Sequence, residues 1–462
     1  MKAKKLLSIA LASMLAIASL TGCGEKKDDK ISITIGNAPV EGQSGYDNYM
    51  KRINEFKADH QDWNVESSSF TYDVKNFMVK AAANQLPTTW STFFTEIKTI
   101  SEAGYCADIS KNLKETGLDK ILNPEIMKVV TGGNGEIWGL PTDAYAQGLH
   151  INKRLFKEAG LVNADGTVKA PQTYDELAEY AKTIKEKTGV AGFAIPSTSN
   201  CGGWHLMNIA WSYGTEFMKQ DSNGKWTATF DSDEFKTAVK WLYDLKWKYN
   251  AVPEGAALDQ AGLFKTFGSG QAAMMIANPP INDLTTKYDM QIEDIACVSM
   301  PAGPKGRYAQ TGGNLIMFNA NASDEEINAA LAWYIEQGGF DSKITDESLK
   351  KSEENYNAQL EAGRIILPSS SAAMQVCINR EGEEKLKALQ DQYSNVDAKD
   401  YNDYFDFGKV QLKAEEPVCC QELYAVLDNI VQEVLVNKDA DIDALVKTAA
   451  SDFQKNSLDN IK

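Results

Sequence analysis

The sequence predicts an α/β protein with at least two lobes, and three observations support this prediction. The chain has 462 residues, which is more than a single hydrophobic core usually holds. Residues 31–35 alternate between apolar and polar side chains, as a β-strand does, and residues 63–66 form a second strand-like stretch. Between them, apolar residues over 49–56 recur at helical spacing. The resulting β-α-β unit predicts parallel strands that are covered by helices.

The first residues have the parts of an export signal. Three lysines stand among the first five residues, and the stretch from Leu6 to Leu20 contains no charged residue. This stretch is shorter than the roughly 20 apolar residues that a membrane-spanning helix needs. We therefore expect a cleaved signal peptide over residues 1–22 and no permanent membrane span at this position.

The motif Leu20-Thr21-Gly22-Cys23 resembles the bacterial lipobox, in which the cysteine is acylated and becomes the first residue after cleavage. The resemblance implies a lipid on Cys23, with two or three acyl chains such as palmitate, and attachment to the cell membrane. Residues 23–30 are then a charged, solvated tether. In the alternative, an ordinary signal peptide is cleaved near Gly22 and Cys23 has no special role.

The charge balance of the chain limits its partners. The formal net charge is −17, and removal of the first 22 residues, which carry three lysines, leaves −20. Such a surface repels phosphate groups and anionic lipids, so nucleic-acid binding is disfavoured. A neutral or cationic solute fits this field better than a polyanion does. The charge can also serve solubility alone.

Cysteine and histidine residues are too few and too widely spaced to indicate a metal centre. Six cysteines follow Cys23, and none of them has the paired spacing of a zinc site. The chain has three histidines, so a three-histidine site would need all of them. We expect no metal, no cofactor and no histidine-based catalysis. We expect free thiols, with a vicinal disulfide between Cys419 and Cys420 as the alternative.

Further helices and strands are marked by their end signals. Thr173 starts a predicted helix over 174–187, and Ser323 starts another. In both cases a glutamate stands three residues after the cap, as in a capping box. The runs 271–276 and 314–318 are short and apolar and lie between turn residues, which predicts buried strands.

Several segments resemble, in order and spacing, the extracellular sugar-binding proteins of ABC importers, in the branch of the maltose-binding protein. The most specific are 135–141 and 148–160, which are similar to the family's crossing between lobes and to the helix after it. Weaker support comes from later segments: 173–177, 264–278, 421–426 and 439–445. The resemblance implies the two-lobed type II periplasmic-binding-protein fold, which closes around a ligand by hinge motion.

The resemblance also divides the chain into lobes. It implies a first lobe of residues 31–143 and 313–407 and a second lobe of residues 144–312 and 408–462. The chain then crosses between the lobes near Asp143, Gly312 and Phe407. Each lobe is expected to hold a mainly parallel sheet with covering helices, and the ligand is expected in the cleft between the lobes.

A sugar site needs aromatic rings for C–H faces and amides or carboxylates for hydroxyls. Tyr145 lies in the first crossing and Trp204 stands near the start of an apolar helix, and both match ligand contacts of the maltose-binding branch. Each could also pack structurally, Tyr145 in the hinge and Trp204 in the core. Thr92, Thr95 and Glu96 match contact positions at the carboxyl end of a strand, where open α/β sheets place ligands.

Polar residues in turns form a second set of candidates. Asn37 follows the first strand, Asn278 ends a strand before two prolines, and Gly313 and Asn314 lie in the second crossing. The asparagine amides can bind sugar hydroxyls, or they can satisfy backbone groups in their own turns.

The chain departs from the maltose-binding branch at several contact positions. Thr92, Pro280 and Leu423 stand where that branch has stacking aromatic residues, and Thr88 replaces a common aspartate. A maltodextrin ligand is therefore not expected.

These observations predict a monomeric lipoprotein that captures a mono- or oligosaccharide and delivers it to the permease subunits of an ABC importer, without turning it over. We expect it at the extracellular face of the cell membrane. A Gram-positive source is expected, because such cells have no outer membrane to retain a binding protein that lacks an anchor.

Two alternatives remain open. The same fold could bind a peptide, a polyamine or another small solute; convergent carboxylates in the cleft would favour a polycation, whereas stacked aromatics with amides would favour a sugar. A surface glycoside hydrolase is less expected. It would need only two carboxylates about 5 to 10 Å apart. No Gly-x-Ser-x-Gly, His-Glu-x-x-His or phosphate-loop motif accompanies such a pair in the sequence.

Overall fold

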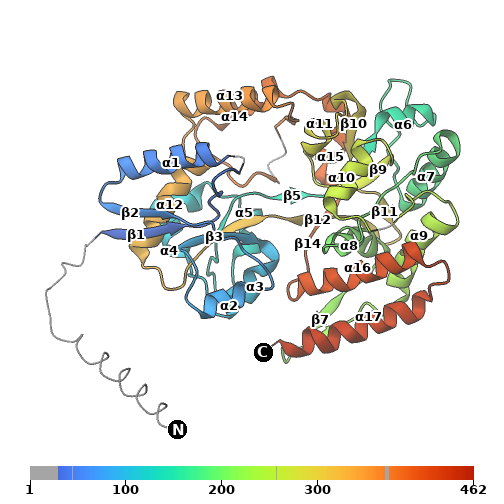
Figure 1. Cartoon of the computed structure of the whole chain (residues 1–462), viewed down its shortest axis with the longest axis horizontal. Coiled ribbons are helices and arrows are strands. Elements are labelled where there is room, and N and C mark those ends of the chain that lie inside the picture. Colours follow the sequence, from blue (N-terminus) through green and yellow to red (C-terminus); the bar gives the residue numbers. More distant parts are fainter. Residues whose placement is uncertain (1–29, 44, 256, 370–373, 462) are drawn as a thin grey trace, which may run out of the picture.

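The computed structural model describes residues 30–43, 45–255, 257–369 and 374–461. The predicted signal peptide and the predicted lipid site at Cys23 lie outside these described residues. Two lobes lie side by side and are joined by strands that run between them (Figure 1). Within the described ranges, no helix is both long enough and apolar enough to cross a membrane.

The first lobe contains a five-stranded sheet. Its strand order is β2 (Trp63–Ser67), β1 (Ile31–Ile35), β3 (Thr89–Phe93), β13 (Asn314–Phe318) and β4 (Leu140–Pro141). The first three strands are parallel, as the β-α-β unit predicts, whereas β13 runs antiparallel to both of its neighbours.

Helices cover both faces of this sheet. One core holds Ile53, Phe56 and Trp333 and lies under α1 (Tyr46–Asp59), α4 (Ser110–Thr116) and α12 (Asp324–Gly338). The other core holds Phe77, Trp90 and Ile100 and involves α2 (Phe77–Ala82), α3 (Ile97–Glu102) and α5 (Pro124–Val130). At the start of α12, Ser323 and Glu326 form the predicted capping box.

The second lobe contains a three-stranded sheet in the order β10 (Ile295–Val298), β6 (Gly148–Asn152) and β9 (Met274–Ala277). The central strand β6 is antiparallel to both of its neighbours. The helices of this lobe are α6 (Lys153–Glu158), α7 (Tyr174–Thr188), α8 (Cys201–Tyr213), α9 (Asp233–Trp247), α10 (Gln260–Gly268), α11 (Asp283–Thr286), α16 (Cys420–Val436) and α17 (Ile442–Asn456). A small hairpin joins β7 (Met218–Gln220) to β8 (Trp226–Ala228).

The expectation of mainly parallel sheets therefore needs correction at β6 and β13. Both strands follow directly on a crossing between lobes. Strand β3 ends at Phe93, and β13 begins opposite it at Asn314. A chain that enters a lobe at the hinge must run away from the hinge, whereas β1 and β3 run towards it. The direction of β13 is thus fixed by the crossing.

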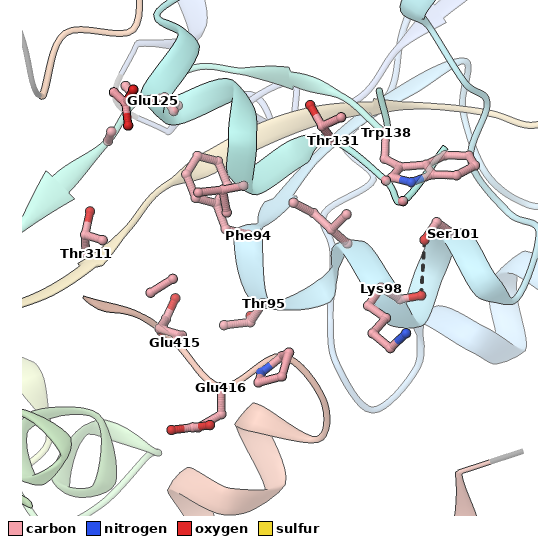
Figure 2. A pocket seen from close by; sticks show the side chains of 18 of the residues that line it. Phe94, Thr95, Lys98, Ser101, Glu125, Thr131, Trp138, Thr311, Glu415 and Glu416 are labelled. Atoms are coloured by element: carbon pink, nitrogen blue, oxygen red, sulfur yellow. Dashed lines mark hydrogen bonds between the residues drawn. The ribbon is translucent and has the colours of Figure 1, made fainter. Parts of the chain in front are cut away.

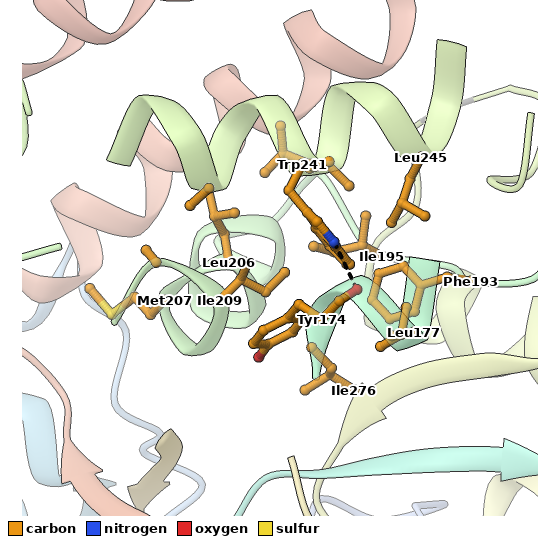
Figure 3. Packing of buried hydrophobic residues seen from close by; sticks show 14 of the residues in the cluster. Tyr174, Leu177, Phe193, Ile195, Leu206, Met207, Ile209, Trp241, Leu245 and Ile276 are labelled. Atoms are coloured by element: carbon orange, nitrogen blue, oxygen red, sulfur yellow. Dashed lines mark hydrogen bonds between the residues drawn. The ribbon is translucent and has the colours of Figure 1, made fainter. Parts of the chain in front are cut away.

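The core of the second lobe is the largest of the molecule. Figure 3 shows Trp241 of α9 above Tyr174, the first residue of α7. The Trp241 Nε1–H donates to the Tyr174 carbonyl oxygen at 3.0 Å, and the two rings meet edge to face at 5.3 Å. Thr173 caps α7 by accepting a hydrogen bond from the Glu176 backbone N–H, as predicted, but the predicted capping box does not form, because the Glu176 carboxylate accepts from the Gln172 backbone N–H at 2.7 Å instead. This packing holds the lobe as one rigid unit.

The two lobes are joined by a hinge sheet. It consists of β5 (Tyr145–Ala146), β12 (Gly306–Gly312) and β14 (Gln411–Ala414), with β11 (Ala302–Gly303) at one side. Strand β12 is antiparallel to β5 and parallel to β14. The three predicted crossings near Asp143, Gly312 and Phe407 thus each lie next to a strand of this one sheet.

The segment between α12 and β14 touches both lobes. It contains α13 (Asp346–Glu361), α14 (Glu383–Tyr393) and α15 (Asn402–Phe405). Cys377 belongs to a core of the first lobe, whereas Ile365 packs with Met275 of the second lobe. The Tyr404 hydroxyl donates to the Ala146 carbonyl oxygen at 2.8 Å. The sequence boundary at 407 stays a prediction, and this packing favours assigning residues near 365 and 404 to the second lobe.

Candidate functional site

Side chains from both lobes and from the hinge meet at one place. We define the interlobe cluster as Thr95 and Glu96 after β3, Tyr145 of β5, Trp204 of α8, Glu415 after β14, and Gln421 of α16. Thr95 and Glu96 lie in η1 (Phe94–Glu96), a single turn that directly follows the carboxyl end of a parallel strand. Open α/β sheets bind ligands at such ends.

The cluster joins the two lobes through side-chain contacts. The Gln421 side-chain amide lies 3.5 Å from the Thr95 hydroxyl oxygen, at the long limit of a hydrogen bond. The rings of Tyr145 and Trp204 meet edge to face, with centroids 5.9 Å apart. Trp204 is close enough to influence the pKa of both Tyr145 and Glu415. The contact between Gln421 and Thr95 runs from one lobe to the other, so movement of one lobe relative to the other would change it.

Both carboxylates of the cluster accept hydrogen bonds from neutral donors. Glu96, 7 % exposed, accepts from the Tyr72 hydroxyl and from the Thr95 hydroxyl, the latter at 3.0 Å. Burial raises the pKa of Glu96 above its usual value, although these bonds lower it in part. Glu415 accepts from the Tyr424 hydroxyl at 2.5 Å.

The Glu415 carboxyl has the most shifted acid pKa of the cluster. Burial raises the pKa of Glu415 to about 7, the bond from Tyr424 opposes this shift, and the nearby charge of Glu96 adds to it. Removing a carboxylate from water disfavours its charged form, and a second negative charge does the same. The cluster therefore has two acids that lack full charge compensation.

Two cavities flank the cluster. The larger, about 750 Å³, is lined by Thr95 and Glu415 and by residues of α3 and α5. Figure 2 shows Phe94, Thr95 and Glu415 around this opening. The smaller, about 270 Å³, is lined by Tyr145, by aromatic residues near 404–407 and by the amides of Gln359 and Gln390. Ligand pockets commonly have volumes of about 300 to 1,000 Å³.

Four of the predicted site residues lie in the cluster: Thr95, Glu96, Tyr145 and Trp204. Thr92 lies in β3, three residues before Thr95, and is 2 % exposed. Its hydroxyl has no hydrogen-bond partner among the described residues. Asn278 follows β9 directly, and the next residue, Pro279, lines the smaller cavity. These positions keep Thr92 and Asn278 as predictions.

The other predicted residues contact distant segments of the chain. The Asn37 side-chain oxygen accepts from the Ser91 backbone N–H at 2.6 Å. The Asn314 side-chain amide donates to the Asp143 carboxylate at 2.8 Å. A Cβ atom on Gly313 would lie 2.3 Å from the Asp143 carbonyl oxygen, so the hinge needs a glycine there. Structural roles thus account for the contacts of these three residues.

Sequence reasoning did not select Glu415, Gln421, Tyr72 or Tyr424. The resemblance included residues 421–426 but assigned no role to Gln421. Glu415 stands two residues before Pro417 and five residues before the start of α16. A polar residue just before a helix, close to a predicted lobe crossing, is the sequence signal that could have identified it. Its partner Glu96 lies more than 300 positions earlier, so only the fold reveals the pair.

The cysteines of the described residues are not paired with one another. Cys106, Cys201, Cys297, Cys377, Cys419 and Cys420 are free thiols. In the ranges that the structure covers, no group of three or more histidine, cysteine or acidic residues is arranged to hold a metal ion.

Two α/β lobes on a hinge sheet, with aromatic and polar side chains between them, define a class: proteins that bind a small solute between two lobes. Within this class, the chain belongs to the family of bacterial extracellular solute-binding proteins, because the family model matches residues 37–339. This match confirms the family that the sequence motifs predicted.

Two curated relatives show the range of the family. A protein of Brucella abortus (strain 2308) that is named as a binding protein is 26 % identical over 325 residues, which cover 67 % of this chain and 74 % of that protein. The arabinooligosaccharide-binding protein of Halalkalibacterium halodurans is 26 % identical over 112 residues, which cover 24 % of this chain and 22 % of that protein.

Solved structures confirm the type II fold. A solute-binding protein of Thermotoga lettingae with bound α-D-tagatose has a TM-score of 0.66 at 20 % identity, over 92 % of this chain and 99 % of that chain. The GacH receptor of Streptomyces glaucescens, solved with acarbose, has a TM-score of 0.63 at 17 % identity, over 93 % and 99 %. UgpB of Mycobacterium tuberculosis with glycerophosphocholine has a TM-score of 0.65 at 14 % identity, over 92 % and 98 %.

Proposed function

We propose that the protein captures an extracellular sugar or oligosaccharide between its lobes and delivers it to the permease of an ABC importer. The observation that carries the proposal is the interlobe cluster, in which aromatic rings and hydrogen-bonding groups from both lobes meet. The arabinooligosaccharide-binding relative and the sugar-bound neighbours add support.

The chemistry of the cluster suits a saccharide. The indole of Trp204 offers a face to the C–H surface of a sugar ring, and Glu96, Glu415 and Gln421 offer acceptors and a donor to its hydroxyls. A ligand that contacts both lobes stabilises the closed form relative to the open form. An importer can then distinguish loaded from empty protein by shape, and no bond needs to be broken.

A matched screen tests this proposal. The purified protein is exposed to panels of mono- and oligosaccharides, peptides and polyamines, and thermal stability is recorded with each. We expect a saccharide to raise the melting temperature and to remain intact, because a ligand that binds only the folded protein stabilises it. Product analysis addresses the alternative in which Glu96 and Glu415 act as a hydrolytic pair. Stabilisation by peptides or amines alone, or cleavage of the sugar, would overturn the proposal.

We further propose that a lipid on Cys23 holds the protein at the extracellular face of the membrane of a Gram-positive organism, where it acts as a monomer. The support is the lipobox-like motif and the family, whose members are extracellular. A binding protein must stay near its permease, and two or three acyl chains suffice for stable attachment.

Replacing Cys23 with serine tests the anchor. We expect the variant to appear in the medium or soluble fraction instead of the membrane fraction, with unchanged sugar affinity, because Cys23 is not one of the residues of the interlobe cluster. Fractionation of cells that express each form, followed by immunoblotting, measures this. Retention of Cys23→Ser in the membrane fraction would count against a lipid at this position.

A further inference from the structure

The carboxylates between the lobes lack a cationic partner. Their donors are the hydroxyls of Tyr72 and Thr95 on Glu96 and the hydroxyl of Tyr424 on Glu415. In the described part of the chain, no lysine or arginine shifts the pKa of either acid. A third carboxylate, that of Glu422 at the start of α16, is close enough to raise the pKa of Glu96. Three elements thus bring negative charge to one place.

Two lysines beside the cluster, Lys413 and Lys98, have other partners. Lys413 of β14 lies over the Trp211 ring, 4.6 Å from its centroid, and its charge acts on Glu416. Lys98, which lines the larger cavity, pairs with Glu102. Neither lysine compensates Glu96 or Glu415. The cluster therefore has an excess of acceptors and of negative charge that the protein itself does not neutralise.

Two buried side chains next to Glu415, those of Gln310 and Tyr424, add to this excess of hydrogen-bond acceptors. Gln310 of β12 is fully buried, and its side-chain amide donates to the Tyr424 hydroxyl at 2.7 Å. Tyr424 in turn donates to the Oε1 atom of Glu415, so this relay fixes one carboxylate oxygen as an acceptor. The Gln310 Oε1 atom has no partner among the described residues. Glu415 Oε2 lies on the side of Gly312 and Tyr145.

We propose that the interlobe cluster selects a saccharide that carries a protonated amino group, with the ammonium between Glu96 and Glu415 and a ring face on Trp204. This inference rests on the proposed sugar-binding function and adds the class of sugar. An ammonium group supplies three donors and one positive charge, which match unfilled acceptors and unpaired carboxylates. The rings of Tyr145 and Trp204 attract a cation through their faces.

A neutral sugar would leave the charge of this site unmatched. Its hydroxyls can donate to Glu96 and Glu415, but they bring no positive charge to these two carboxyl groups. Glucose has a hydroxyl of similar size in place of the amino group and carries no charge, so the comparison of glucosamine with glucose isolates the contribution of the cation. N-acetylglucosamine also lacks the charge, but its acetyl group adds bulk at the same position.

Calorimetric titration tests the inference with matched ligands: glucosamine, N-acetylglucosamine and glucose, each as the monosaccharide and as β-1,4-linked oligomers, and spermidine. We expect the free amino form to bind at least about 10-fold more tightly than its acetylated or neutral counterpart, because a charge-assisted hydrogen bond is stronger than a neutral one. In the Glu415→Gln variant this preference is expected to fall to about 3-fold or less.

The control variant is Glu433→Gln, which removes one negative charge near the far end of α16, where Glu433 bonds Asn437. It is expected to keep the full preference. Equal or tighter binding of neutral or acetylated sugars would overturn the inference and leave the sugar-binding function standing. Binding of spermidine without binding of any sugar would overturn the sugar-binding function as well. A preference that survives Glu415→Gln would place the cation away from the interlobe cluster and contradict the inference.

Discussion

Replacing Trp204 with alanine is expected to weaken saccharide binding by about 2 to 3 kcal/mol, roughly 30- to 150-fold in Kd. The substitution removes the indole face and the edge-to-face contact with Tyr145. Loss of a central aromatic residue commonly has an effect of this size, because it also leaves partner groups unpaired. Titration calorimetry with the best saccharide of the screen measures the change.

Two control variants make this result interpretable. Trp204→Phe keeps an aromatic face and is expected to retain most of the affinity. Trp226→Ala removes a tryptophan from the small hairpin of β8, away from the interlobe cluster, and is expected to leave the affinity unchanged. If Trp204→Ala folds and binds as tightly as the wild type, Trp204 is a packing residue and the cluster is not the sugar site.

The second large effect concerns stability as a function of pH. The pKa of Glu415 is raised from 4.5 to about 7 in the folded protein. Between these values the folded protein holds a proton that the unfolded chain releases, so the free energy of unfolding falls as the pH rises. Glu415→Gln cannot lose a proton. The free energy of unfolding of the variant minus that of the wild type should therefore increase by about 2 kcal/mol when the pH rises from 5 to 8.

Urea unfolding at pH 5 and pH 8, without ligand, measures this difference. The sign is the informative part: an acid with a raised pKa stabilises the fold at low pH, and this contribution is lost as the pH passes about 7. Because Glu96 lies close enough to couple with Glu415, the double variant with Glu96→Gln should enlarge the effect. An equal stability difference at both pH values would show that the pKa of Glu415 is not raised in the folded protein.

Local structure was the part of the fold that the sequence predicted best. Strands β1 and β13 have the predicted bounds, and Thr173 and Ser323 cap their helices as expected. These features depend on neighbouring residues. The antiparallel direction of β6 and β13 was not predicted, since it depends on where a distant segment crosses the hinge.

The candidate site was predictable in part, for a similar reason. The resemblance identified Tyr145 and Trp204, which the fold brings together. It could not reveal that Asn314 would bond Asp143 or that Asn37 would bond Ser91, because these partners lie 171 and 54 positions away in the sequence. Glu415 was missed because its neighbours Glu96 and Trp204 are far away in sequence.

A crystal structure of the protein with the tightest saccharide of the screen tests the central claim most directly. The account predicts a sugar ring against Trp204, with a polar atom within about 3 Å of the Glu96 or Glu415 carboxylate. A saccharide bound elsewhere, with the interlobe cluster unchanged and its carboxylates still bonded only to Tyr72, Thr95 and Tyr424, would contradict it.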